Sequence, residues 1–130
     1  MPNKSVARTD STYVDAHGLT IHYYVWKAPK EKGVMQLAHG LGEHALRYEY
    51  LAQALVAAGY TVYADDHRGH GETGIKHHGG DFSKLGRLGP GGLRATIASV
   101  RQFTEIIRAE NPGVPLVLLG HSWGSLMAQK

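Results

Sequence analysis

The sequence predicts an α/β fold in which an antiparallel hairpin precedes parallel strands with flanking helices. Three observations lead to this class. Short β-rich or apolar runs alternate with two segments of helical periodicity. The later apolar runs are nearly continuous, which is typical of strands covered on both faces. The spacing of strands and helices fits right-handed crossovers between parallel strands.

The hairpin is predicted over residues 12–27. Two β-rich runs flank the stretch Asp15-Ala16-His17-Gly18, and its aspartate and glycine suit a turn. Residues 1–11 are polar and are assigned to an N-terminal tail, and residues 12–130 are assigned to a single domain.

Three strands are predicted after the hairpin, over residues 33–40, 60–66 and 114–120. The helix between the first two is marked by apolar side chains at helical spacing and by a glycine suited to a C-cap: Tyr48, Leu51, Leu55, Ala58 and Gly59. We expect Leu51 and Leu55 to lie in the core.

A second helix is predicted before the last strand. Its periodic positions are Leu93, Ile97, Val100, Thr104 and Ile107, and it ends at Asn111-Pro112-Gly113. Phe103 and Ile107 are expected in the core. The long glycine-rich connection before this helix, residues 69–92, is predicted to be irregular.

The composition excludes several classes of protein. The chain has 130 residues, 14 Lys and Arg against 11 Asp and Glu, and no cysteine. The basic residues are scattered, so we expect no nucleic-acid partner. Without cysteine there is no disulfide framework, no thiolate nucleophile and no zinc site with sulfur ligands. No leader-like or membrane-spanning apolar run occurs, and we expect a soluble, cytoplasmic protein.

Ser122 is the predicted nucleophile. It lies between Gly120 and Gly124, directly after a predicted strand and before a predicted helix. A tight strand-to-helix turn exposes the serine oxygen at the top of a sheet, and the two glycines avoid collisions with neighbouring elements. The helix N-terminus adds unpaired N–H groups that can stabilise an oxyanion.

A second motif supplies the other half of a predicted oxyanion hole. His39 and Gly40 end an earlier strand and Leu41 follows them. A tetrahedral oxyanion needs two preorganised N–H donors, and we assign them to the backbones of Leu41 and Trp123. The alternative is that this motif is only a glycine turn fixed by His39.

Other polar residues admit a second interpretation. Histidines and aspartates near the end of the strand predicted over residues 60–66 and in the long connection suggest a metal site: His67, His70, His77, His78, Asp65, Asp66 and Asp81. They lack a regular spacing that would fix ligand geometry, so we assign no metal and no cofactor. Asp65 and Asp66 could serve acid–base chemistry, but we favour the interpretation that they brace the following turn.

Three motifs together resemble a known family. This chain resembles the α/β-hydrolases of the monoacylglycerol lipase and lysophospholipase group. The resemblance lies in the order and spacing of three segments, HGLGEHALRY, YADDHRGHGET and LLGHSWGS. The resemblance covers residues 12–130 and implies one α/β-hydrolase domain acting on esters of single acyl chains. It matches Ser122 to the nucleophile, and Leu41 and Trp123 to the oxyanion donors. His39, Gly40, Gly120 and Gly124 support these motifs, and Thr73 stands where many relatives have serine.

The catalytic acid and base are missing from this sequence. In this fold they follow the serine, and no Asp, Glu or His occurs after Ser122. We therefore expect residues 12–130 to be the N-terminal half of the domain, cut just after the serine turn and inactive alone. An incomplete chain, proteolysis after Lys130 or a second chain carrying the rest would explain this. We also expect such a half to leave a strand edge uncovered.

The expected partner is a lipid ester of low molecular weight, with transient contact to a membrane or micelle. Two other functions stay open. One is a catalytically silent binding module with the same fold, and the other is a hydrolase of a different substrate, such as a thioester, peptide or halide.

Overall fold

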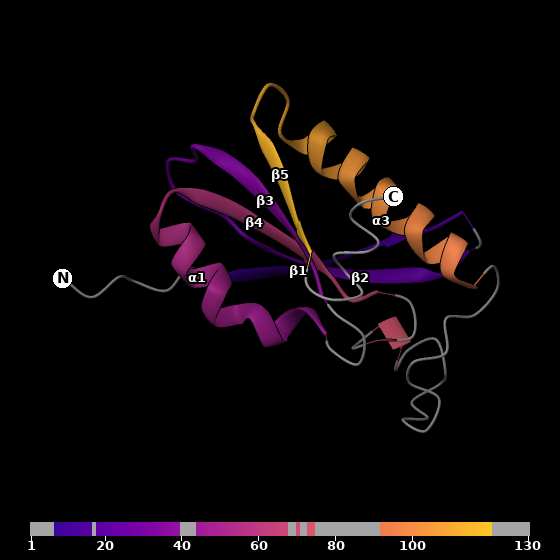
Figure 1. Cartoon of the computed structure of the whole chain (residues 1–130). Helices are drawn as coiled ribbons and strands as arrows, with labels where there is room; N and C mark the ends of the chain where they lie inside the picture. Colours follow the sequence, from indigo (N-terminus) through magenta and orange to yellow (C-terminus); the bar gives the residue numbers. More distant parts are fainter. Residues whose placement is uncertain are drawn as a thin grey trace.

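A computed structural model describes residues 7–16, 18–39, 44–67, 70, 73–74 and 92–120. The strands are β1 (Arg8–Val14), β2 (Thr20–Trp26), β3 (Gly33–Ala38), β4 (Tyr60–Asp65) and β5 (Leu116–Gly120). The helices are the 3₁₀ turn η1 (Ala45–Tyr48), α1 (Glu49–Ala57) and α3 (Gly92–Glu110). The described strands form one sheet in the order β1-β2-β4-β3-β5, as Figure 1 shows.

The sheet is mixed in the way that the sequence predicts. β3 pairs in parallel with β4 on one side and β5 on the other. β1 and β2 form an antiparallel hairpin, and β2 joins β4 antiparallel. The predicted hairpin, parallel strands and flanking helices are therefore confirmed.

The first strand begins earlier than predicted. β1 starts at Arg8, which pairs with Trp26, so residues 8–11 continue the hairpin although we assigned them to the tail. Most side chains of β1 are exposed because it is an edge strand. Backbone hydrogen bonds to β2 define how far this strand extends. Because backbone groups make these bonds, they require no alternation of apolar side chains that the sequence would show.

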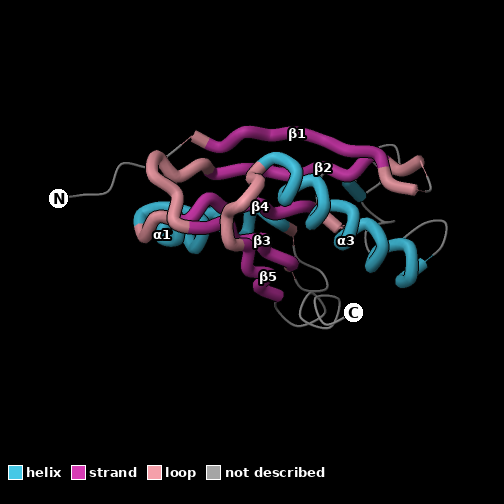
Figure 2. Tube along the Cα trace, turned by 90° about the horizontal axis from the view of Figure 1, so that it is seen from above, coloured by secondary structure: helices cyan, strands magenta, loops and turns pink. Residues whose placement is uncertain are grey.

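Helices α1 and α3 cover opposite faces of the sheet (Figure 2). Alternation along each strand divides the side chains between them, so that Tyr24 and Trp26 of β2 face α1 while Ile21 and Tyr23 face α3. Each helix therefore completes its own hydrophobic core.

The α3 core is built around Phe103, which is fully buried. Its ring centroid lies 5.7 Å from that of Tyr13, 5.0 Å from that of Tyr23 and 6.1 Å from that of Tyr63. Ile107 lies one helical turn further along and is also buried. Both residues were predicted in the core, and the structure confirms them.

The α1 core has small side chains on its helix. Ala52 and Val56 are the buried residues of α1, and Leu55 packs partly against them. The prediction that Leu51 lies in the core is wrong, because 36% of it is exposed. The buried stripe lies one residue, or about 100° of helix rotation, away from the leucines. Gly59, at φ 101°, ends the helix as predicted.

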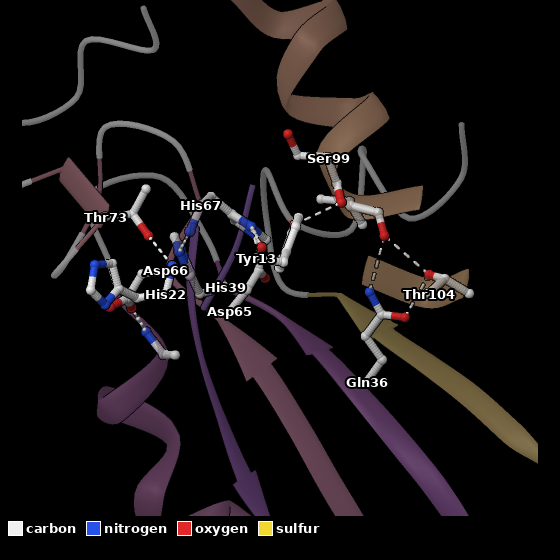
Figure 3. A network of polar contacts seen from close by, with 12 residues as sticks. Tyr13, His22, Gln36, His39, Asp65, Asp66, His67, Thr73, Ser99 and Thr104 are labelled. Carbon is white, nitrogen blue, oxygen red and sulfur yellow. Dashed lines mark hydrogen bonds and ion pairs between the residues drawn. The ribbon is translucent and has the colours of Figure 1, made fainter. Parts of the chain in front are cut away.

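Polar contacts fix α3 against the hairpin and β3. The Ser99 hydroxyl donates to the Asp15 carboxylate at 2.9 Å, and the Tyr13 hydroxyl donates to the Ser99 carbonyl at 2.8 Å. The Thr104 hydroxyl donates to the Gln36 side-chain oxygen at 2.6 Å, as Figure 3 shows. These buried and partly buried bonds tie α3 to the hairpin and to β3.

β5 lies at the edge of the sheet in the described part of the chain. Every second residue is exposed, with Val117 at 53% and Leu119 at 44%. The expectation that the strand before the serine turn leaves an edge uncovered stays a prediction, because the residues after Gly120 lie outside the described part of the chain.

Candidate active site

Polar side chains gather where β3 and β4 end. The two strands are parallel neighbours, so their carboxyl ends meet at one edge of the sheet. His39 follows β3, while Asp65, Asp66 and His67 end or follow β4. All four are buried, each with about 1% of its surface exposed. Ligands of open α/β sheets bind beyond this edge.

His39 connects the two strand ends. Its Nε2 accepts a hydrogen bond of 2.9 Å from the backbone N–H of His67. The ring centroids of these two histidines, both labelled in Figure 3, are 3.9 Å apart. The ring centroid of His70 lies 5.1 Å from that of His39. Because Nε2 is the acceptor, this bond requires the proton of a neutral imidazole to be on Nδ1.

Asp65 holds the ring of His67. The Nδ1 of His67 lies 3.1 Å from one carboxylate oxygen of Asp65 and 3.2 Å from the other. A histidine oriented by a carboxylate is also the arrangement of a general base. Here both side chains are buried, at 0% and 1% exposure, so the pair is suited to bracing the strand end rather than to meeting a substrate.

Asp66 joins three elements. One carboxylate oxygen accepts the backbone N–H of Ala45, at the start of η1, at 2.7 Å. The other accepts the hydroxyl of Tyr24 on β2, also at 2.7 Å. Its own backbone N–H donates to the carbonyl of His22 at 2.9 Å. The structure thus places both aspartates in bracing contacts, as the sequence analysis favours.

Thr73 returns the chain to β2. Its hydroxyl oxygen accepts the backbone N–H of His22 at 2.8 Å, and the side chain is fully buried. A threonine hydroxyl can make this bond as a serine can, so the departure from the family pattern keeps the acceptor.

The two predicted oxyanion motifs leave the sheet side by side. In the register of β3 and β5, Ala38 pairs with Gly120. Ala38 directly precedes His39, and Gly120 is two residues before Ser122. Of the predicted site residues, His39 and Gly120 are described. The others lie outside the described residues: Gly40, Leu41, Ser122, Trp123 and Gly124.

Comparison with known proteins identifies the family. Residues 29–130 match the family described as "Serine aminopeptidase, S33". The chain belongs to this family.

Relatives of this family member are named as lipases and esterases. The chain is 38% identical to a monoacylglycerol lipase of Mycolicibacterium smegmatis over 92% of its own length and 40% of the relative's. It is 33% identical to the human monoglyceride lipase, over 88% of this chain and 35% of that one. The chain thus spans well under half of the length of these relatives.

A solved structure gives the same result for the fold. The crystal structure of a highly thermostable carboxyl esterase from Bacillus coagulans, in complex with glycerol, superimposes with a TM-score of 0.83 at 28% identity. The match covers 96% of this chain and 39% of that one. The predicted α/β-hydrolase family and fold are confirmed.

Sequence reasoning missed two contributors to this edge of the sheet. These are Tyr24 and the backbone of Ala45, which hold the Asp66 carboxylate. Nothing in the local pattern of either residue marks it, because both contacts join segments far apart in the chain.

The residues described by the structure contain no group of three or more His, Asp or Glu placed to hold a metal ion. His77, His78 and Asp81, which the metal interpretation also needs, lie outside them. Among the same described residues, no helix is long and apolar enough to cross a membrane.

Proposed function

We propose that this chain carries the nucleophile and oxyanion hole of a serine hydrolase that cleaves esters of single acyl chains. The observation that carries the proposal is the pairing of Ala38 with Gly120, since it brings the chain to both predicted motifs from adjacent strands. The family and the names of the relatives support the same chemistry.

The proposed reaction proceeds through an acyl-enzyme. The Ser122 oxygen attacks the ester carbonyl while a histidine base takes its proton, and the N–H groups of Leu41 and Trp123 stabilise the oxyanion. The intermediate expels the alcohol, which receives the proton from that histidine. Water then repeats the sequence on the acyl-serine and releases the fatty acid and free serine.

The acid and base of this proposal lie outside the 130 residues, either in further polypeptide or in a second chain. The buried pair of Asp65 and His67 does not replace them, because neither side chain is exposed to a substrate. We expect the 130-residue chain alone to be inactive, with the serine hydroxyl lacking a base. The cytoplasmic location stays a prediction.

Monoacylglycerols and lysophospholipids are the proposed substrates, with brief contact to the lipid surface that holds them. The relatives include proteins named monoacylglycerol lipase and phospholipase. A second candidate is an aminopeptidase substrate, because the description of the matched family names that activity.

A fluorophosphonate probe tests the nucleophile in the full-length protein. We expect stoichiometric labelling of the wild type, loss of labelling and of ester hydrolysis in Ser122→Ala, and normal labelling in the neighbouring control Ser125→Ala. Labelling of Ser122→Ala would place the nucleophile elsewhere. An intact wild type that takes no label would instead favour a silent binding module.

Parallel assays then assign the substrate. Monooleoylglycerol, lysophosphatidylcholine, a short p-nitrophenyl ester and an aminoacyl p-nitroanilide are compared by kcat/KM. We expect a lipid ester to be preferred by at least about tenfold over the short ester, since each buried methylene of the acyl chain contributes binding energy. Preference for the anilide would support the aminopeptidase instead.

A further inference from the structure

The segment that contains Leu41 is held at both ends by two consecutive residues. Before it, Nε2 of His39 accepts the backbone N–H of His67 at 2.9 Å. After it, the backbone N–H of Ala45 donates to the Asp66 carboxylate at 2.7 Å. We name these four residues, His39, Ala45, Asp66 and His67, the loop clamp.

We propose that His39 and Asp66 are positioning residues, which hold the backbone donor of Leu41 in place for the developing oxyanion. This inference rests on the proposed function and assigns to the loop clamp a part of that reaction. Leu41 is two residues after His39 and four before Ala45. The two contacts therefore fix the described residues on either side of Leu41, His39 and Ala45.

Burial makes the clamp stiff. His39, Asp66 and His67 each have about 1% of their surface exposed, and Ala45 is equally buried. Water therefore does not compete for the two bonds. Opening either one leaves a buried N–H without an acceptor, which disfavours the open state.

The clamp is itself anchored to the rest of the sheet. Tyr24 on β2 donates its hydroxyl to the second oxygen of Asp66, and the carbonyl of His22 accepts the Asp66 N–H. Asp65 orients the ring of His67, whose centroid lies 3.9 Å from that of His39 (Figure 3). The positions of both loop ends are therefore set by β2 and β4, and not by the loop.

Such stiffness matters for an oxyanion donor. Catalytic groups need to be held within about 0.5 Å of the productive geometry. A misplacement of about 1 Å can reduce the rate by about 10²-fold. Because the donor acts on the transition state, loss of the clamp should lower kcat and leave KM nearly unchanged.

Two amide substitutions at His39 test whether the side chain must be long enough to accept the backbone N–H of His67. The side-chain amide of His39→Gln can place an acceptor near the position of Nε2, whereas that of His39→Asn ends near Nδ1 and cannot reach His67. In the full-length protein we expect His39→Asn to lower kcat by about 10- to 100-fold with KM within about threefold. We expect His39→Gln to retain kcat within about fivefold of the wild type.

Asp66 gives a second, independent pair. Asp66→Asn retains an oxygen for the Ala45 N–H, and Asp66→Ala removes it. We expect Asp66→Ala to lose kcat as His39→Asn does, and Asp66→Asn to recover most of it. A trifluoromethyl ketone inhibitor, whose adduct with Ser122 carries an oxyanion, should bind both damaged variants weaker by the same factor as kcat falls.

Gln36→Ala is the matched control for a loss of stability. Gln36 is fully buried on β3, the strand that directly precedes His39, but its side chain contacts Thr104 and Val100 of α3. We expect it to lower the Tm and leave kcat within about twofold.

The outcomes distinguish this inference from the proposed function. If Ser122→Ala is inactive and folded His39→Asn keeps the wild-type kcat, the clamp has no role in the reaction. Equal damage in His39→Asn and His39→Gln would overturn it too, because reach to His67 would then not matter. Full activity of Ser122→Ala would contradict the proposed function itself, whatever the clamp variants do.

Discussion

The two faces of the sheet are packed by opposite means. On the α3 face, large side chains fill the space, with Phe103 among three tyrosine rings and Ile107 beside them. On the α1 face, the helix contributes small side chains, Ala52 and Val56, and the bulk comes from the strands, as with Trp26.

This difference teaches that burial and residue size are separate properties of a helix face. A helix with alanine on its buried stripe can approach the sheet closely, because there is little side chain between the two backbones. A helix with phenylalanine there needs room for the ring. The two faces should therefore respond to opposite kinds of substitution.

The largest effect is expected for Phe103→Ala. The truncation leaves a cavity among the rings of Tyr13, Tyr23 and Tyr63, and should lower the free energy of unfolding by about 3 to 5 kcal/mol. Urea unfolding of the full-length protein, followed by fluorescence, measures it. Phe103→Leu fills part of the cavity and should cost less; equal losses for both would mean that ring packing is not the cause.

Ala52→Leu should destabilise the packing of α1 on the sheet, because it enlarges a buried side chain where Phe103→Ala truncates one. Ala52 is fully buried, so added methylenes force α1 away from the sheet and should cost about 1 to 3 kcal/mol. The control is Ala57→Leu on the exposed side of the same helix, with a change within about 0.5 kcal/mol. A neutral Ala52→Leu would show that α1 does not approach the sheet closely.

Tyr63, on the α3 face, should make the stability of the protein depend on pH. Burial raises the pKa of Tyr63 to about 12 from its ordinary value of 10; hydrogen bonding by Asn111 opposes this, and Glu110 adds to it. The folded state holds the phenol proton more tightly, so the stabilisation is complete below pH 10 and is lost as the pH rises towards 12.

Between pH 9 and 11 this loss should amount to about 1 kcal/mol. The free energy of unfolding, measured at several pH values across this range, should fall more steeply with pH for the wild type than for Tyr63→Phe, which cannot ionise. Identical slopes in the two proteins would mean that Tyr63 does not titrate abnormally.

The smallest effect is expected for Leu51→Ala, which tests the corrected face of α1. Leu51 is 36% exposed, so its truncation should change the unfolding free energy by less than about 1 kcal/mol. Val56→Ala, on the buried stripe, should cost more. The reverse order would restore the leucine stripe that the sequence suggested.

The same contrast explains which parts of the fold could be predicted. Val100, Phe103 and Ile107 are large and periodic, so the buried face of α3 follows from the pattern. On α1 the prediction was wrong for Leu51 and missed Ala52, because alanine gives a weak apolar signal although it is buried there, while Leu55 packs partly against the core. The early start of β1 could not be predicted, since an edge strand needs no apolar residues.

The candidate site divides in the same manner. His39, Asp65 and Asp66 stand out as polar residues at strand ends, and the structure brings them together. The partners of Asp66 are separated from it by 42 residues at Tyr24 and 21 at Ala45. Such contacts depend on the tertiary fold and leave no mark in the local sequence.

The bonds at His39 and Ala45 also bear on protein engineering. Because the scaffold determines where the intervening segment starts and stops, residues grafted into it from a related enzyme leave those end points unchanged. Exchanging that segment while keeping its two boundary residues should leave the assembly of the sheet undisturbed.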